Sequence, residues 1–193
     1  MERLWCERMT NAIRILGLDP GLRRTGWGVI AVDGSRLSHV AHGVIRPDDT
    51  RPLAERLTFL FDAVTAVIAE HLPHEAAIEE TFVSQNPSST LKLGHARAAA
   101  MIAPAKAGLI VAEYAATVVK KAVVGTGGAD KAQVAFMIKR LLPTAGEPKA
   151  DAADALAVAI AHAHARTHLR QGFGGQARAE ALVLRSSVGS AGG

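Results

Sequence analysis

Residues 13–30 read IRILGLDPGLRRTGWGVI, and the fold of the chain can be worked out from this stretch. The apolar run Ile13–Leu18 is typical of a buried strand, Pro20–Gly21 forces a turn, and a second apolar run begins at Trp27. The stretch therefore predicts a hairpin that carries one carboxylate, Asp19, at its mouth.

Asp19 allows two interpretations. A carboxylate just past a buried strand loses hydration and needs a positive partner, and no Lys or Arg lies within three residues of it on either side. A metal ion would meet that need. Alternatively, the side chain caps the Pro-Gly turn, as Asp side chains often do. The stretch alone leaves both interpretations open.

Composition limits the class of protein. The chain has 193 residues, 49% of them apolar, which suits one compact domain with a substantial core. Lys and Arg number 22 against 18 Asp and Glu, and the net charge of +4 permits an anionic partner without requiring one. The single cysteine, Cys6, excludes a disulfide framework and indicates a reducing compartment. No apolar run reaches the roughly 18 residues of a membrane span, so we expect a cytoplasmic protein with no membrane contact.

Beyond the hairpin, strands and helices follow one another along the chain. Leu37–Ile45 predicts a third antiparallel strand, and Ala76–Ile78 and Leu109–Ala112 predict two short buried strands. Apolar residues recur at helical spacing in four segments, at about 53–71, 88–104, 131–142 and 150–164. We therefore expect an α/β fold, a mixed five-stranded sheet with its first three strands antiparallel and helices on its flanks.

Three local features refine this prediction. Ser88 and Ser89 are candidate caps of the second helix, and Pro104 is expected to kink that helix or end it early. Residues 117–124 mix β-branched residues with lysines, so the pattern fits either a short helix or an extended segment.

Acidic residues recur where they can meet. Asp19 ends the first strand, and the strand over Ala76–Ile78 ends in Glu79 and Glu80, either of which can point inward because strand residues alternate faces. Asp151 and Asp154 are three residues apart, which puts both on one face of a helix. The same spacing is also typical of a helix N-cap followed by an acid at N3.

Four carboxylates without clustered Cys or His would form an all-oxygen ligand set. Such ligands suit magnesium or manganese rather than zinc. Two such ions roughly 3.5–4 Å apart are the usual means of hydrolysing a phosphodiester. The alanines that surround Asp151 and Asp154 add almost no bulk, so this end of the helix can approach the sheet closely.

Five separated motifs resemble those of the RuvC-type Holliday-junction resolvases, nucleases of the RNase H-like superfamily. In chain order they are ILGLDPGLRRTGWGVI, AIEETF, LKLGHARAAA, EYAATVVKKAVVGTGGADKAQV and ADAADALAVAIAHAH. The resemblance implies an RNase H-like fold and a catalytic metal site. It implies that the four acids of that site are Asp19, Glu79, Asp151 and Asp154, and so selects Glu79 over Glu80. For these oxygen ligands we expect Mg²⁺ as cofactor, with two ions in the active complex and Mn²⁺ as a substitute.

The same resemblance implies an activity and partners. The family forms a homodimer that binds four-way junction DNA during recombination and repair, and nicks two opposing strands symmetrically. A two-fold junction is most simply met by two identical subunits, which agrees with this expectation. Partnership with a branch-migration motor is implied by the family alone.

The resemblance also implies DNA contacts. Phe82 matches an aromatic residue that stacks on a base near the crossover, although an aromatic at this position can equally pack in the core. Lys120 and Lys131 match basic residues near the scissile phosphate. Further candidates for phosphate contacts, each of which can instead be a solvated surface charge, are Lys92, Arg97 and Lys121.

We expect three segments along the chain. Residues 1–12 form an N-terminal extension, 13–168 the RNase H-like nuclease domain, and 169–193 a flexible tail in which glycine and serine dilute the apolar residues. Met9 is an alternative start, because the periodic pattern begins only at Ile13.

Two other functions compete with the nuclease. Asp19–Gly21 followed by Thr25–Gly26 resembles the first phosphate loop of ATP-binding proteins of the actin and sugar-kinase kind. Those proteins need two lobes, for which this chain is too short, and a second Asp-x-Gly hairpin, which this chain lacks. The other alternative is a module that binds junctions without cutting them, and the complete set of four acids argues against it.

Overall fold

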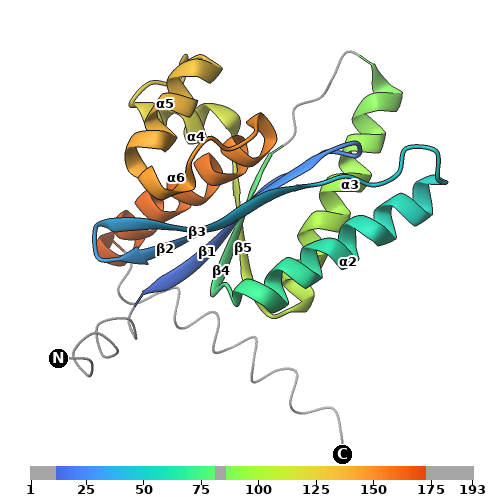
Figure 1. Cartoon of the computed structure of the whole chain (residues 1–193), viewed down its shortest axis with the longest axis horizontal. Coiled ribbons are helices and arrows are strands. Elements are labelled where there is room, and N and C mark those ends of the chain that lie inside the picture. Colours follow the sequence, from blue (N-terminus) through green and yellow to red (C-terminus); the bar gives the residue numbers. More distant parts are fainter. Residues whose placement is uncertain (1–11, 81–85, 173–193) are drawn as a thin grey trace, which may run out of the picture. The chain divides into compact units, whose positions relative to one another are not determined.

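The computed structural model describes residues 12–80 and 86–172 (Figure 1). Phe82, Cys6 and Met9 therefore lie outside the described residues, as does most of the predicted tail. Residues up to His162 form one compact unit, and Ala163 begins a second unit. The predicted domain limit at residue 168 stays a prediction.

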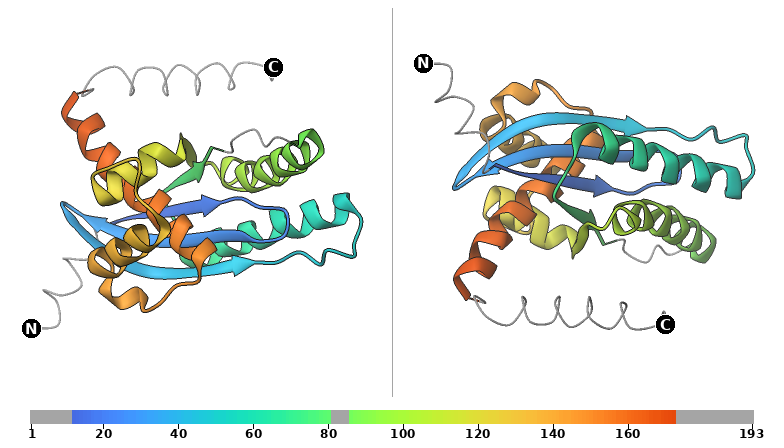
Figure 2. Two further views of the ribbon diagram at one scale, coloured as in Figure 1. Left: turned by 90° about the horizontal axis from the view of Figure 1, so that it is seen from above. Right: turned by 90° about the horizontal axis from the view of Figure 1, so that it is seen from below.

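A five-stranded mixed sheet in the order β3-β2-β1-β4-β5 forms the centre of the first unit. β1 pairs antiparallel with β2, β2 pairs antiparallel with β3, and β4 and β5 run parallel to β1. Figure 2 shows from above and from below how the first three strands run side by side. The strands are β1 (Ile13–Asp19), β2 (Thr25–Asp33), β3 (Arg36–Ile45), β4 (Glu75–Glu79) and β5 (Ile110–Tyr114). The predicted mixed sheet is thus confirmed.

Helices flank this sheet. Figure 1 separates two of them, α2 and α3, from a second group that contains α4, α5 and the beginning of α6. The helices are α2 (Leu53–His71), α3 (Pro87–Lys106), α4 (Ala116–Val124), α5 (Lys131–Leu141) and α6 (Ala150–Gly172), with a short 3₁₀ turn at Pro143–Ala145. The segment that fitted either a helix or an extended piece is therefore helical. None of the helices in the described ranges is long and apolar enough to cross a membrane.

One apolar core joins α2 and α3 to the sheet. Alternate residues of β1 and β4 point toward these two helices because side chains in a strand alternate between its faces. The core contains Leu16 and Leu18 of β1, Ala76 and Ile78 of β4, Leu60 and Val64 of α2, and Ala96 and Ala100 of α3. The other face of β1 and β4 is left for α6 and for the acidic residues.

Glycines let α6 lie directly on this second face. A Cβ atom on Gly17 would collide with the carbonyl oxygen of Ala155, and one on Gly28 would come within 2.6 Å of the Leu156 side chain. The alanine-rich helix therefore approaches β1 and β2 as closely as the sequence predicted. This close approach places the first turns of α6 over the end of the first hairpin.

The expected cap of α3 was wrong. Asn86, not Ser88 or Ser89, is the N-cap residue, and its Oδ1 accepts hydrogen bonds from the backbone N–H groups of Ser88 (3.0 Å) and Ser89 (3.3 Å). Pro87 takes the first helical position, where a missing N–H costs nothing. Pro104 lies in the last turn, and the helix ends at Lys106.

Candidate active site

Strand pairing and the start of α6 bring the four predicted acids to one edge of the sheet. Asp19 and Glu79 end β1 and β4, which are parallel neighbours, so both carboxylates lie at the same edge. Asp19 pairs with Gly26, and a Cβ atom on Gly26 would collide with the backbone carbonyl of Asp151. Asp151 and Asp154 lie in the first two turns of α6. Asp151 follows the first helical residue, so it is not the N-cap of α6.

The carboxylates affect one another electrostatically. The pKa of Asp19 is raised from 3.8 to about 7, mainly because the side chain is buried. The negative charges of Glu79, Asp154 and Asp151 raise this pKa further, and the positive charge of Lys131 opposes them. All three other acids therefore lie close enough to Asp19 to disfavour its ionised form.

Two of the other acids are perturbed in the same direction. Burial raises the pKa of Glu79, and the charge of Asp154 raises it further. Burial also raises the pKa of Asp154, with a further contribution from Asp151. Lys120 and Lys131 act in the opposite direction on both carboxyls, which places these two lysines beside the acids.

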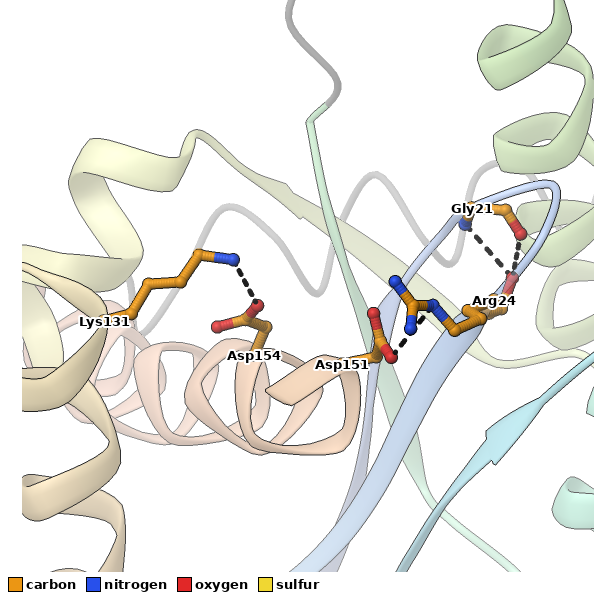
Figure 3. Close-up of polar contacts among 6 residues, drawn as sticks. Gly21, Arg24, Lys131, Asp151 and Asp154 are labelled. Carbon is orange, nitrogen blue, oxygen red and sulfur yellow. Dashed lines mark hydrogen bonds and ion pairs between the residues drawn. The ribbon is translucent and has the colours of Figure 1, made fainter. Parts of the chain in front are cut away.

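Basic side chains engage two of the acids (Figure 3). The Arg24 Nε atom lies 3.5 Å from Oδ2 of Asp151, and the Lys131 Nζ atom lies 3.8 Å from Oδ2 of Asp154. Within residues 12–80 and 86–172, no three His, Cys, Asp or Glu side chains are placed to hold one metal ion together. Two of the four acids thus pair with basic side chains, and the acids are not arranged here to hold one ion together.

The chemistry of this cluster nevertheless fits a hard divalent cation. The donors are all carboxylate oxygens, which Mg²⁺ and Mn²⁺ prefer. The pKa of Asp19 is raised mainly by burial, and the charges of the three other acids raise it further against the opposing charge of Lys131. A divalent ion would relieve the repulsion among these carboxylates.

Thr25 closes the turn that follows Asp19. Its hydroxyl donates to the carbonyl oxygen of Gly21 (2.8 Å) and accepts from the N–H of Gly21 (3.1 Å). The Thr25 side chain is fully buried. Within the described residues, the side-chain hydrogen bonds that hold this turn therefore come from Thr25 and not from Asp19, which disfavours the turn-cap interpretation of Asp19.

Lys131 is held at the start of α5 by a capping box. The Asp130 side chain accepts from the N–H of Gln133 (2.8 Å), and the Gln133 side chain accepts from the N–H of Asp130 (2.9 Å). Lys131 and Asp154 border a cavity of about 230 Å³ between α5 and the start of α6. The Lys131 charge on α5 thus faces Asp154 at this cavity.

The remaining predicted DNA contacts differ in their surroundings. Lys92 on α3 and Lys121 on α4 are exposed. Arg97 is engaged within the protein, because its Nε donates to the backbone oxygen of Glu79 (3.3 Å) and its guanidinium pairs with Glu113. Arg97 therefore anchors the end of the strand that carries Glu79. A contact of these residues, or of Phe82, with DNA stays a prediction.

A partly buried polar chain that the sequence did not reveal ties α6 to the sheet. The Tyr114 hydroxyl is hydrogen-bonded to His162 Nδ1 (2.8 Å), and His162 Nε2 is hydrogen-bonded to a carboxylate oxygen of Glu75 (2.9 Å). Burial, with a further contribution from the charge of Glu75, raises the pKa of Tyr114. Because Tyr114 pairs in register with Glu79, this chain fixes α6 relative to the strands that bear the acids.

Three antiparallel strands followed by two parallel ones, with acids at adjacent strand ends and on a covering helix, form the arrangement of an RNase H-like protein. The sequence profile of the family described as crossover junction endodeoxyribonuclease RuvC matches residues 15–162. The chain belongs to this family, which confirms the resemblance seen in its motifs.

Known members of the family are similar over most of the chain. A crossover junction endodeoxyribonuclease RuvC of Caulobacter vibrioides is 70% identical over 146 residues, which cover 76% of this chain and 86% of that protein. The RuvC of Maricaulis maris is 65% identical over 78% of this chain and 90% of that protein. Thermus thermophilus RuvC, solved in complex with a Holliday junction substrate, superposes with a TM-score of 0.76 at 33% identity, over 81% of this chain and 96% of that one.

Proposed function

We propose that this protein resolves four-way DNA junctions by metal-dependent nicking of two opposing strands, in recombination and repair. Family membership supports the nuclease class, and the Thermus thermophilus relative was solved with a Holliday junction substrate. The observation in this chain that carries the proposal is the acid cluster, in which three other carboxylates help raise the pKa of Asp19 to about 7.

In this proposal Asp19, Glu79, Asp151 and Asp154 hold the metal. When bound, Mg²⁺, or Mn²⁺ in its place, supplies an activated water and a positive charge at the leaving oxygen, most effectively as a pair of ions. Asp19 must lose its proton to bind such an ion, and its raised pKa makes binding dependent on pH near neutrality. Glu79 comes from β4 and Asp154 from α6, so these two acids supply ligands from the two sides of the site.

The basic residues receive the DNA backbone. Lys120 and Lys131 lie beside the acids. Their positive charges attract a phosphate that the carboxylates would otherwise repel. Lys92 and Lys121, which are exposed, contribute further phosphate contacts, and Arg97 contributes one when it exchanges its pairing with Glu113 for a phosphate. Phe82 stacks on a base near the crossover, where an exposed ring is worth about 1–3 kcal/mol without reading sequence.

Symmetric nicking calls for two copies of the site. A homodimer presents two identical acid clusters to the two equivalent strands of a junction. We further propose that the dimer acts in the cytoplasm, where the chromosome of a bacterium lies, and that it acts together with a branch-migration motor.

A cleavage assay tests the proposal. Purified protein is incubated with a mobile four-way junction or with a linear duplex of the same sequence, in Mg²⁺ or in EDTA. We expect paired nicks in the junction only, and only with Mg²⁺. Junction binding without nicks in Mg²⁺ or Mn²⁺ would support the non-catalytic module instead, and ATP turnover without DNA would support the kinase-like alternative.

A further inference from the structure

We propose that Arg24 is a positioning residue that exchanges one anion for another: it holds Asp151 in the metal-free protein and turns to a DNA phosphate when metal and junction bind. This inference rests on the proposed function and deepens it. The loop between β1 and β2 thereby couples metal binding to DNA binding.

The geometry places Arg24 where it can reach both partners. Its Nε lies 3.5 Å from Asp151 Oδ2, and Figure 3 shows its side chain extending from the loop toward the first turn of α6. The Arg24 side chain is 60% exposed, whereas that of Asp151 is 25% exposed. The guanidinium therefore stands at the solvent side of the acid cluster, where a DNA backbone would arrive.

The backbone at the base of this side chain is held in place, whereas the side chain itself is largely exposed. Arg24 directly precedes Thr25, which is fully buried and bonded twice to Gly21. A long side chain on a fixed backbone can change partners without any movement of the loop. The observed pair uses only Nε, and a guanidinium has further N–H donors at its two Nη atoms.

The ion pair between Arg24 and Asp151 is weak enough for Arg24 to exchange Asp151 for a phosphate. An ion pair with so exposed a member is weak, because water and salt screen it. Arg24 still competes with a metal ion for Asp151, because the Asp151 oxygens that face the guanidinium must turn away from Arg24 to bind a cation. Arginine stays charged at any pH of interest and matches the geometry of a phosphate with two parallel N–H groups. Release of Asp151 to a metal therefore also releases a phosphate-binding group.

The exchange predicts opposite effects of one substitution on two equilibria. Arg24→Gln keeps a polar side chain and removes the charge. In the DNA-free protein, we expect calorimetric titration to show that Mn²⁺ binds about 2- to 5-fold more tightly, because Asp151 has lost its competing partner. In Ca²⁺, junction affinity should fall about 3- to 10-fold, and the slope of log affinity against log salt should decrease by about one.

Two further variants separate the exchange from other effects. Arg23→Gln removes a neighbouring exposed charge in the same loop, and should leave Mn²⁺ affinity unchanged. In an Asp151→Asn background, Arg24→Gln should no longer tighten Mn²⁺ binding, because the pair is already broken; this double-mutant cycle measures the coupling directly. Arg24→Lys, which keeps the charge, should retain most of the junction affinity.

Distinct outcomes would overturn the inference. Weaker binding of both Mn²⁺ and junction in Arg24→Gln would mean that Arg24 supports the loop only, and no change in either would mean that it has no role. Both results leave the proposed function standing if the unmodified protein still cuts junctions. Conversely, absence of cutting by the unmodified protein would refute the proposed function, while the Mn²⁺ titrations would still decide whether Arg24 restrains Asp151.

Discussion

Gly26 in β2 lies directly beneath the backbone carbonyl of Asp151 in α6, so that a Cβ atom at position 26 would collide with that carbonyl. Gly26 is also the strand partner of Asp19. One residue without a side chain therefore sets how near the helical acids come to the strand acids. This contact couples the packing of α6 to the geometry of the proposed metal site.

Gly26→Ala tests this coupling. The added methyl group would collide with backbone atoms of α6, and the collision can be relieved only if the helix moves away from the sheet. We therefore expect a loss of at least about 2 kcal/mol in the free energy of unfolding. Urea denaturation measures it. Gly94→Ala is the matched control, because nothing lies within 4 Å of a Cβ atom there and the position is helical. It should be neutral or stabilising by up to about 1 kcal/mol. Equal stability of the two variants would contradict the close contact.

The raised pKa of Asp19 predicts how stability depends on pH in the absence of metal. In the unfolded chain this carboxyl ionises near its ordinary pKa of 3.8, whereas in the folded protein it ionises at about 7. Between these values the folded state holds a proton that the unfolded state has lost, so the free energy of unfolding falls as pH rises and levels off above about 7.

Asp19→Asn removes this dependence. In EDTA at pH 8 we expect the variant to be more stable than the unmodified protein, by at most about 4 kcal/mol, and the difference should vanish near pH 4. Chemical denaturation at a series of pH values measures the difference. A variant that is less stable at pH 8 would show that Asp19 is stabilised, not strained, by its surroundings.

Divalent metal should turn the destabilisation by ionised Asp19 into a stabilisation of the folded protein. An ion that binds only the folded state stabilises it by mass action, by about 2.7 kcal/mol at a concentration 100 times its dissociation constant. Because a proton competes with the metal at Asp19, the rise in Tm on adding Mn²⁺ should be larger at pH 8 than at pH 6. Thermal denaturation with potassium chloride of equal ionic strength is the control. An equal rise at both pH values would place the bound ion away from Asp19.

The partly buried chain from Tyr114 through His162 to Glu75 gives a separate prediction about stability. Tyr114→Phe removes one hydroxyl and leaves His162 Nδ1 without that hydrogen bond in a buried place, which should cost about 1–3 kcal/mol. His95→Ala, at an exposed position of α3, should change the free energy of unfolding by less than about 0.5 kcal/mol. A loss in Tyr114→Phe no larger than in His95→Ala would mean that the bond contributes nothing.

The sheet and most helices could be predicted because their signals are local. The apolar runs and the turn at Pro20–Gly21 fixed the first hairpin, and helical spacing located α2, α5 and α6. Asn86 was missed as a cap because Ser88 and Ser89 offer the same chemistry two and three positions later. The segment at 117–124 stayed ambiguous because its β-branched residues suit strands, whereas packing of Val119 and Val123 makes it a helix.

The parts of the site that could not be predicted join distant segments. His162 and Glu75 are 87 residues apart, and Arg24 meets Asp151 across most of the chain. No local pattern encodes such pairs, although the glycines at 17, 26 and 28 in alternate positions of two paired strands were a signal that a helix lies close. The motifs of the family supplied what periodicity could not, namely the choice of Glu79 over Glu80.

Single-turnover nicking of a four-way junction by Asp19→Asn and Asp154→Asn tests the central claim most directly, with Asp33→Asn, an exposed acid outside the cluster, as control. If the four acids form one metal site, both variants bind the junction within about 3-fold of the unmodified protein and nick it at least ~100-fold more slowly, while Asp33→Asn nicks normally. Nicking at the unmodified rate by either variant would contradict the claim.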